Sequence, residues 1–188
     1  MVLTLLPIIA THKELLIPYL KDPFAVACLQ VNVYWSGYEF CIGIIYFILI
    51  AYAITLLMKK NNFKGFLVLF YATAFCLFLY LFLVVPKIEG YSQRPAINFY
   101  KSLAGKDVYV APYGFKSYAQ YFYFQKQAAI KMGEEEEQNY LLRGAINKPA
   151  YFVVKITEMN FDTICADCKL IKQEGGFLFY ERAAVLQK

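Results

Sequence analysis

Two long apolar runs constrain this chain more than any other feature of its sequence. Tyr38–Met58 carries one charged residue, Glu39, at its edge, and Phe66–Val85 carries none. At ~1.5 Å per residue each run would extend roughly 30 Å as a helix, which matches the thickness of a hydrocarbon core. A core helix of a soluble protein has a polar stripe, and both runs lack one. The sequence therefore predicts two transmembrane helices, with the lipid bilayer as their partner.

The loop between the runs, residues 59–65, sets the expected orientation. It contains three lysines and no acidic residue, and short Lys-rich loops stay in the cytoplasm. We therefore expect a helical hairpin over residues 38–86 whose turn faces the cytoplasm. Pro86 directly follows the second run and is expected to end its helix. Residues 87–188 then lie on the opposite side, which in a bacterium is the periplasmic side of the inner membrane.

The segment before the hairpin begins with "MVLTLLPIIA", which is apolar over a length too short to span a bilayer. It lacks the basic start of a signal peptide. We interpret residues 1–12 as the outer end of a partial third transmembrane helix, so the chain is expected to be the C-terminal piece of something longer. Residues 13–37 are expected to form an extracytoplasmic, interfacial loop, interrupted by Pro18 and Pro23.

Residues 87–188 are expected to fold as a small α/β extracytoplasmic domain with a mixed sheet. Periodicity and turn residues predict the order helix, strand, helix, helix, strand, short helix or turn, strand, strand. The segments in that order are "RPAINFYKSLAGKD", "DVYVAP", "YGFKSYAQYFYFQK", "GEEEEQNYLLRG", "AYFVVKI", "MNFDTICAD", "CKLIKQ" and "FLFYER". Alternating elements of this kind favour a partly parallel sheet with an antiparallel edge.

The aromatic segment "YGFKSYAQYFYFQK" raises the question of nucleic-acid binding. Its rings do not alternate as a strand platform requires, and the net charge of the whole chain is only +5. Phe115, Tyr118, Ala119 and Phe122 follow helical spacing, which predicts a helix packing this face on the sheet. We expect no nucleic-acid partner, and we expect the surplus rings to contact the membrane surface or another part of a larger protein.

Cys165 and Cys168 form a "CADC" motif with three interpretations. In an oxidising compartment the pair can form a disulfide, and otherwise both remain ordinary thiols. A zinc site needs further ligands, yet the only histidine is His12 and the other cysteines lie in or beside the membrane runs. The run Glu134–Glu137 is interpreted as a solvated first helical turn. The sequence therefore predicts no metal site and leaves the disulfide and the free thiols open.

Four basic residues are the candidates for contact with a lipid phosphate or with an acceptor molecule. His12 and Lys13 are expected at the outer membrane interface, Arg94 lies shortly after the second helix, and Lys116 lies in the aromatic segment. Anchoring by snorkelling side chains is the alternative role for all four. The sequence shows no glycine-rich phosphate loop, nucleophile elbow or metal-binding histidine pair.

Four stretches resemble the C-terminal end of bacterial glycosyltransferases of the GT-C type. They resemble family 39, which comprises dolichyl-phosphate-mannose–protein mannosyltransferase-like and aminoarabinose transferase-like enzymes. The stretches are "KDPFAVACLQVNVYWSGYEF", "VYVAPYGFKSYAQYFYFQK", "LLRGAINKPAYFVVKI" and "GGFLFYER".

The resemblance implies transfer of a sugar from a polyprenyl-phosphate donor to a periplasmic acceptor. It also implies an acidic base and a divalent cation in an N-terminal half that this chain does not contain. The expected partners are thus the lipid-linked donor and the missing half, no cofactor is expected in this chain, and the chain alone is expected to be inactive. The alternative is a stand-alone, membrane-anchored binding or scaffold protein without enzymatic activity.

Overall fold

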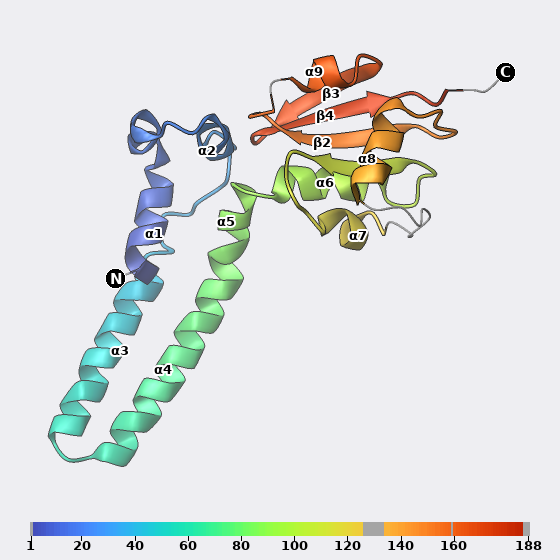
Figure 1. The fold of residues 1–188 in the computed structure, drawn as a ribbon. Coiled ribbons are helices and arrows are strands. Elements are labelled where there is room, and N and C mark those ends of the chain that lie inside the picture. Colours follow the sequence, from blue (N-terminus) through green and yellow to red (C-terminus); the bar gives the residue numbers. More distant parts are fainter. Residues whose placement is uncertain (1, 126–133, 159, 186–188) are drawn as a thin grey trace. The chain divides into compact units, whose positions relative to one another are not determined.

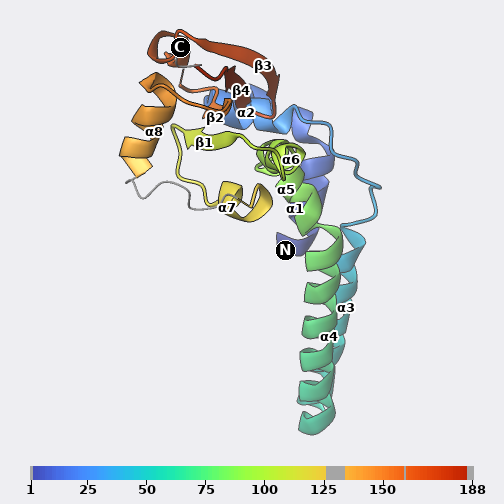
Figure 2. The same ribbon diagram turned by 90° about the vertical axis from the view of Figure 1, so that its right-hand side faces the viewer.

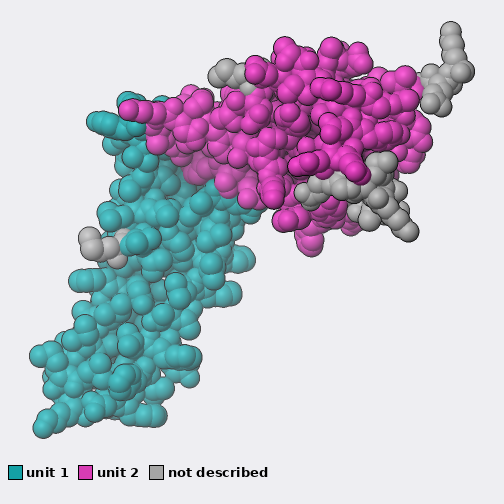
Figure 3. Space-filling view, viewed as in Figure 1, with its two compact units in different colours: residues 1–19, 32–90 teal, residues 20–31, 91–188 magenta. Residues whose placement is uncertain are grey.

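The computed structural model describes residues 2–125, 134–158 and 160–185 of the chain (Figure 1). The chain divides into two compact units (Figure 3). The first unit comprises residues 1–19 and 32–90, and the second comprises residues 20–31 and 91–188. Each unit is described by itself below.

The first unit is built on an antiparallel helical hairpin. Helix α3 spans Cys41–Met58 and helix α4 spans Asn62–Leu83 (Figure 1). Among the described residues, two helical stretches, Cys41–Met58 and Asn62–Gly90, are long and apolar enough to cross a membrane. Most of their large apolar side chains are exposed, as expected for surfaces that face lipid. The prediction of two transmembrane helices is confirmed.

The predicted end of the second helix at Pro86 is wrong. After α4 the chain continues as helix α5, Val85–Gly90, with Val84 between the two helices. Pro86 is the second residue of α5, where a missing N–H costs little because the first helical N–H groups have no intrahelical acceptor. The carbonyl of Val84 accepts bonds from the N–H groups of Lys87 and Ile88, so the helical path goes on past the proline.

Helix α1, Val2–Thr11, completes the first unit and is followed by two 3₁₀ turns, Lys13–Leu15 and Ile17–Tyr19. The helix and these turns are bent by 83° relative to each other. Gly43 of α3 allows α1 to approach closely, since a Cβ there would lie 2.7 Å from the backbone nitrogen of Thr4. Small residues let membrane helices pack in this way. The unit's buried cluster contains Ile42, Cys76, Tyr80 and Val84.

The second unit contains a four-stranded mixed sheet with the strand order β1-β2-β4-β3. The strands are β1 (Tyr109–Tyr113), β2 (Ala150–Lys155), β3 (Cys168–Glu174) and β4 (Phe177–Arg182). Strands β1 and β2 run parallel, and the other two pairs are antiparallel. The predicted mixed sheet with an antiparallel edge is confirmed.

Helices cover both faces of this sheet. They are α6 (Arg94–Leu103), α7 (Ala119–Tyr123), α8 (Glu134–Arg143) and α9 (Phe161–Ile164). Along β2, Val153 packs with the α6 side chains, including Tyr100, whereas its neighbour Phe152 packs with Leu141 of α8 and Phe161 of α9. This alternation follows from the two-residue period of a strand. The result is a three-layer arrangement with α6 and α7 on one face (Figure 2).

Part of the segment predicted as an interfacial loop is helical and belongs to the second unit. Helix α2 spans Pro23–Leu29, and the Asp22 side chain accepts a bond from the Phe24 N–H at its start. The Phe24 ring packs edge-on against Phe177 of β4, with centroids 5.4 Å apart. The Cys28 thiol donates to the carbonyl of Gly175, 3.2 Å away. This ring contact and this hydrogen bond explain why the segment folds onto the β3–β4 hairpin.

Candidate functional site

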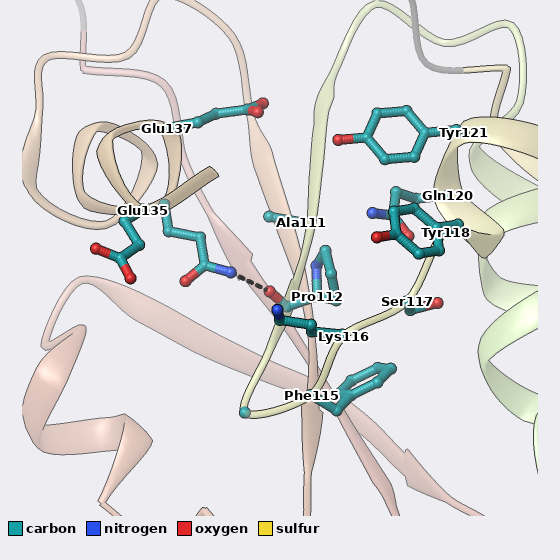
Figure 4. Close-up of a pocket in the computed structure, with 12 residues that line it drawn as sticks. Ala111, Pro112, Phe115, Lys116, Ser117, Tyr118, Gln120, Tyr121, Glu135 and Glu137 are labelled. Carbon is teal, nitrogen blue, oxygen red and sulfur yellow. Dashed lines mark hydrogen bonds between the residues drawn. The ribbon is translucent and has the colours of Figure 1, made fainter. Parts of the chain in front are cut away.

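A pocket of about 350 Å³ opens at the carboxyl end of β1 (Figure 4). Its walls come from the end of β1, from the loop 114–118, from α7 and from the first turns of α8. In open α/β sheets the crevice outside the carboxyl ends of parallel strands is the usual place for a ligand. The pocket therefore lies where this topology favours binding.

The loop after β1 is shaped by a glycine and a serine. Gly114 has a φ of +77°, which glycine adopts without strain. A side chain there would also collide with Glu158, whose Cγ lies 2.4 Å from an ideal Cβ position. The Ser117 hydroxyl accepts a bond from the Ala119 N–H, 3.2 Å away, just before α7 begins. This turn directs Lys116 and Tyr118 to the pocket wall.

Gln120 of α7 is the most deeply buried polar group of the pocket. Its side chain and backbone together are only 3% exposed, and its Oε1 atom has no hydrogen-bond partner among the described residues. Figure 4 shows its amide on the α7 side of the pocket, next to Tyr118 and Tyr121. A buried carbonyl without a partner costs free energy comparable to a lost hydrogen bond. Gln120 thus brings an amide to the pocket wall whose buried oxygen atom would gain from a hydrogen-bond donor.

Helix α8 forms the opposite wall and is fixed to the strand by a side chain. The Gln138 Nε2 atom donates to the carbonyl of Pro112 over 2.9 Å (Figure 4). Glu135 is exposed and Glu137 is half-buried on the same wall. Lys116 is exposed on the loop and supplies the positive charge of the lining. The lining therefore carries both signs of charge.

The chemistry of this lining is suited to binding rather than to bond breaking. Amides, hydroxyls, carboxylates and phenol rings supply donors, acceptors and flat apolar surface. The described residues of the lining include no histidine or cysteine, so they provide neither a Ser–His nor a Cys–His nucleophile pair. The pocket is a candidate recognition site for a polar molecule.

The four basic candidates do not all lie in this pocket. Lys116 lines it, and Arg94, the half-buried first residue of α6, does not. His12 and Lys13 belong to the first unit, at the end of α1. His12 is exposed there and Lys13 is half-buried. Their contact with a lipid phosphate or an acceptor stays a prediction.

The helix face predicted for the aromatic segment is only half right: Phe115 and Ala119 pack against the core of the second unit, whereas Tyr118 and Phe122 do not. The helix is shorter than predicted, and it buries Gln120 and, directly after its end, Phe124, at 8% exposure. Tyr118 and Phe122 were assigned to the packed face, but they are 72% and 76% exposed. Because the chain enters α7 through an irregular loop, the helical register does not extend back to Phe115. The end of the quoted stretch, Lys126, lies outside the described residues.

The first unit contains a second polar cluster, around Glu39. This carboxylate is 6% exposed and accepts bonds from the Ser36 N–H and hydroxyl and from the Gly37 N–H, at 2.8–3.0 Å. It also forms an ion pair with Lys87. Burial alone would raise the pKa of Glu39, but the bonds from Lys87 and Ser36 outweigh it and lower that pKa to about 2.

The Lys87 ammonium group is further enclosed by aromatic rings. It lies 5.7 Å from the centroid of Tyr34 and 5.3 Å from that of Trp35, within the range of a cation–π contact. In the sequence, Glu39 stands out only as a charge at the edge of an apolar run, and no pattern marks Lys87. No local pattern connects residues so far apart in the chain.

Cys165 and Cys168 are joined by a disulfide in the structure, with their Cα atoms 5.3 Å apart. The bridge links the end of α9 to the start of β3. Cys28, Cys41 and Cys76 are free. Within the described ranges, no group of three His, Cys, Asp or Glu side chains is arranged to hold a metal ion.

Comparison with known proteins gives a similarity to one solved protein in two states. The chain is similar to ArnT from Cupriavidus metallidurans bound to undecaprenyl phosphate, with a TM-score of 0.45 and 14% identity, and to its apo state, with a TM-score of 0.43 and 13% identity. The similarity covers 97% and 96% of this chain, which spans 37% of the length of that protein. No protein-family model and no curated protein matches the sequence.

Proposed function

We propose that this chain is the C-terminal part of a polytopic glycosyltransferase of the bacterial inner membrane. In this proposal the enzyme transfers a sugar from a polyprenyl-phosphate donor to an acceptor on the periplasmic side. The hairpin α3–α4 supplies membrane anchorage beside a lipid-linked donor, and the α/β unit supplies a recognition surface for polar substrate groups. The cytoplasmic turn and the periplasmic α/β unit belong to the same proposal and rest on the lysines of the turn.

One observation carries the proposal. The stretches that resemble the family in sequence coincide with the framework of the pocket and of the sheet. "VYVAPYGFKSYAQYFYFQK" contains β1, the pocket loop and α7, whereas "LLRGAINKPAYFVVKI" contains the end of α8 and all of β2. "GGFLFYER" contains β4, which pairs with β2. Segments that are separate in the sequence thus form one continuous part of the second unit.

The catalytic base and the divalent cation of such an enzyme lie, in this proposal, in another part of the enzyme. The described residues offer no cluster of three ligands for the cation, so no step is assigned here to a metal. This chain's own contribution is binding. In this proposal His12 and Lys13, at the end of α1, are the contacts of the first unit with a lipid phosphate.

Photo-crosslinking tests the proposal. The full chain is placed in lipid nanodiscs with a benzophenone-bearing undecaprenyl phosphate and irradiated. We expect labelling of the first unit that unmodified undecaprenyl phosphate suppresses and undecaprenol does not. The H12A/K13A variant should be labelled several-fold less, because two contacts with the phosphate are removed. The matched control K59A/K60A, at the turn of the hairpin, should be labelled like the unchanged chain.

The alternative, a stand-alone membrane-anchored scaffold protein, gives a different outcome in the same assay. Such a protein has no reason to distinguish the phosphate from the alcohol, so both competitors should act equally. The coding sequence upstream of the Met1 codon adds an independent test. An in-frame or adjacent region encoding several membrane helices supports the transferase, and its absence together with a separate promoter and ribosome site supports the scaffold.

A further inference from the structure

We propose that the pocket between α7 and α8 is a saccharide-binding site in which the buried Gln120 amide accepts a hydrogen bond from a ligand hydroxyl. Naming this saccharide as the acceptor of sugar transfer rests on the proposed function. The binding of the saccharide does not, because it is argued from the lining of the pocket.

Gln120 determines what the ligand must supply. Its Oε1 atom is buried and unpartnered among the described residues, and a carbonyl oxygen only accepts hydrogen bonds. The ligand group at this position must therefore donate, which a hydroxyl does and an ionised phosphate or carboxylate does not. The gain is largest here, because no described residue pairs with this buried acceptor in the ligand-free chain.

Two phenol rings beside Gln120 supply a flat apolar surface. Tyr118 and Tyr121 have ring centroids 6.4 Å apart and planes inclined by 31°. Tyr118 is 72% and Tyr121 39% exposed, so both rings keep surface that a ligand can contact. A sugar ring has an apolar C–H face and hydroxyl groups at its edge. The C–H face can stack on the phenol rings while a hydroxyl group donates to the buried Gln120 amide.

The charges of the lining argue against a simple anion site. Lys116 is opposed on the lining by Glu135 and Glu137, so an anion would be attracted by one wall and repelled by the other. Sugar hydroxyls both donate to carboxylates and accept from an ammonium group. The pocket volume of about 350 Å³ lies at the small end of ligand sites, which suits a monosaccharide or a disaccharide.

Saturation-transfer NMR and isothermal calorimetry test this site on the full chain. The chain is held in nanodiscs or in an amine-oxide detergent, because maltoside detergents are themselves saccharides. The probes are the methyl glycosides of glucose, galactose and mannose, maltose, and inorganic phosphate. We expect at least one saccharide to bind, and phosphate not to displace it.

Variants then assign the binding to the pocket. Gln120→Leu keeps the side-chain size but removes the acceptor, and it should weaken binding about tenfold. Gln173→Leu is the matched control, since Gln173 is exposed on β3 and does not line the pocket. It should bind like the unchanged chain. Tyr118→Ala tests the ring independently and should also weaken binding, and its high exposure makes misfolding of this variant unexpected.

The proposal is overturned if no probe saccharide binds, if phosphate displaces the saccharide, or if Gln120→Leu and Tyr118→Ala both bind normally. If Gln120→Leu does not fold, Tyr118→Ala alone decides. Failure of the undecaprenyl phosphate labelling with intact saccharide binding would remove the transferase proposal and leave this one standing. Intact labelling without saccharide binding would do the opposite.

Discussion

Glu39 and Lys87, 48 residues apart in the chain, form an ion pair that ties the start of α3 to α5. The Glu39 carboxylate is almost fully buried, whereas the Lys87 side chain keeps 23% exposure. This pair holds the two ends of the hairpin together at the side away from its turn. Trp35, the only tryptophan of the chain, lies next to Lys87, so its fluorescence reports on the cluster directly.

Replacing Lys87 by Met should destabilise the first unit by about 3 kcal/mol, because it leaves a buried carboxylate without its counter-charge. The double variant E39Q/K87M removes both charges and should lose less stability than K87M alone. Thermal unfolding followed by Trp35 fluorescence in nanodiscs measures both. An equal or greater loss of stability in the double variant would show that Lys87 does not offset the cost of burying the Glu39 charge.

The cluster should also be sensitive to acid. The pKa of Glu39 is lowered from an ordinary 4.5 to about 2 in the folded chain. The ionised carboxylate therefore stabilises the folded state fully above about pH 4.5, and this contribution is lost as the pH falls from about 4.5 to about 2. Trp35 fluorescence should stay constant from neutral pH to about pH 5 and change below it. A change centred near neutral pH, or one that persists in Glu39→Gln, would disprove this assignment.

The face of α7 can be tested with a matched pair of phenylalanines. Phe124 is buried and Phe122 is exposed. Phe124→Ala should reduce the stability of the second unit by about 3 kcal/mol, and Phe122→Ala by less than about 0.5 kcal/mol. Far-ultraviolet circular dichroism during urea unfolding measures the difference. The opposite order would restore the helix face that spacing alone predicts.

The disulfide is tested by counting thiols. Alkylation of the denatured, unreduced chain should modify Cys28, Cys41 and Cys76 only, and prior reduction should raise the number to five. The bridge closes a short loop, so C165A/C168A should cost about 2 kcal/mol of stability at most. Five modified thiols without reductant, measured by mass spectrometry, would show that the pair is not bridged.

The hairpin and the order of the α/β elements were predictable because their patterns are long or local. The two runs carry a single charge, Glu39 at an edge, and so predict helices in a bilayer. The residues "EGG" between two strand patterns predict a hairpin, which β3 and β4 form. Pro86 was misjudged because a proline that follows an apolar run ends one helix and starts another equally well. The packing around Val84 decides between these outcomes, and packing is not visible in sequence.

The candidate site was predicted only at Lys116. Gln120 lies outside the face Phe115, Tyr118, Ala119 and Phe122 that helical spacing predicts. That spacing starts at Phe115, whereas the helix begins only at Ala119. The packing of α2 on the sheet could not be predicted either, because its contacts with Phe177 and Gly175 join segments far apart in the chain. Tertiary packing overrides local pattern where elements are short.

The central claim, that this chain belongs to an enzyme moving sugar from a polyprenyl-phosphate donor, is tested most directly by a transfer assay. Membranes of source cells lacking the chain are supplied with radiolabelled polyprenyl-phosphate sugar, with and without the chain restored. We predict that sugar transfer to the membrane or periplasmic acceptor fraction is lost without the chain and returns when it is restored. Equal transfer in both membranes would contradict the claim.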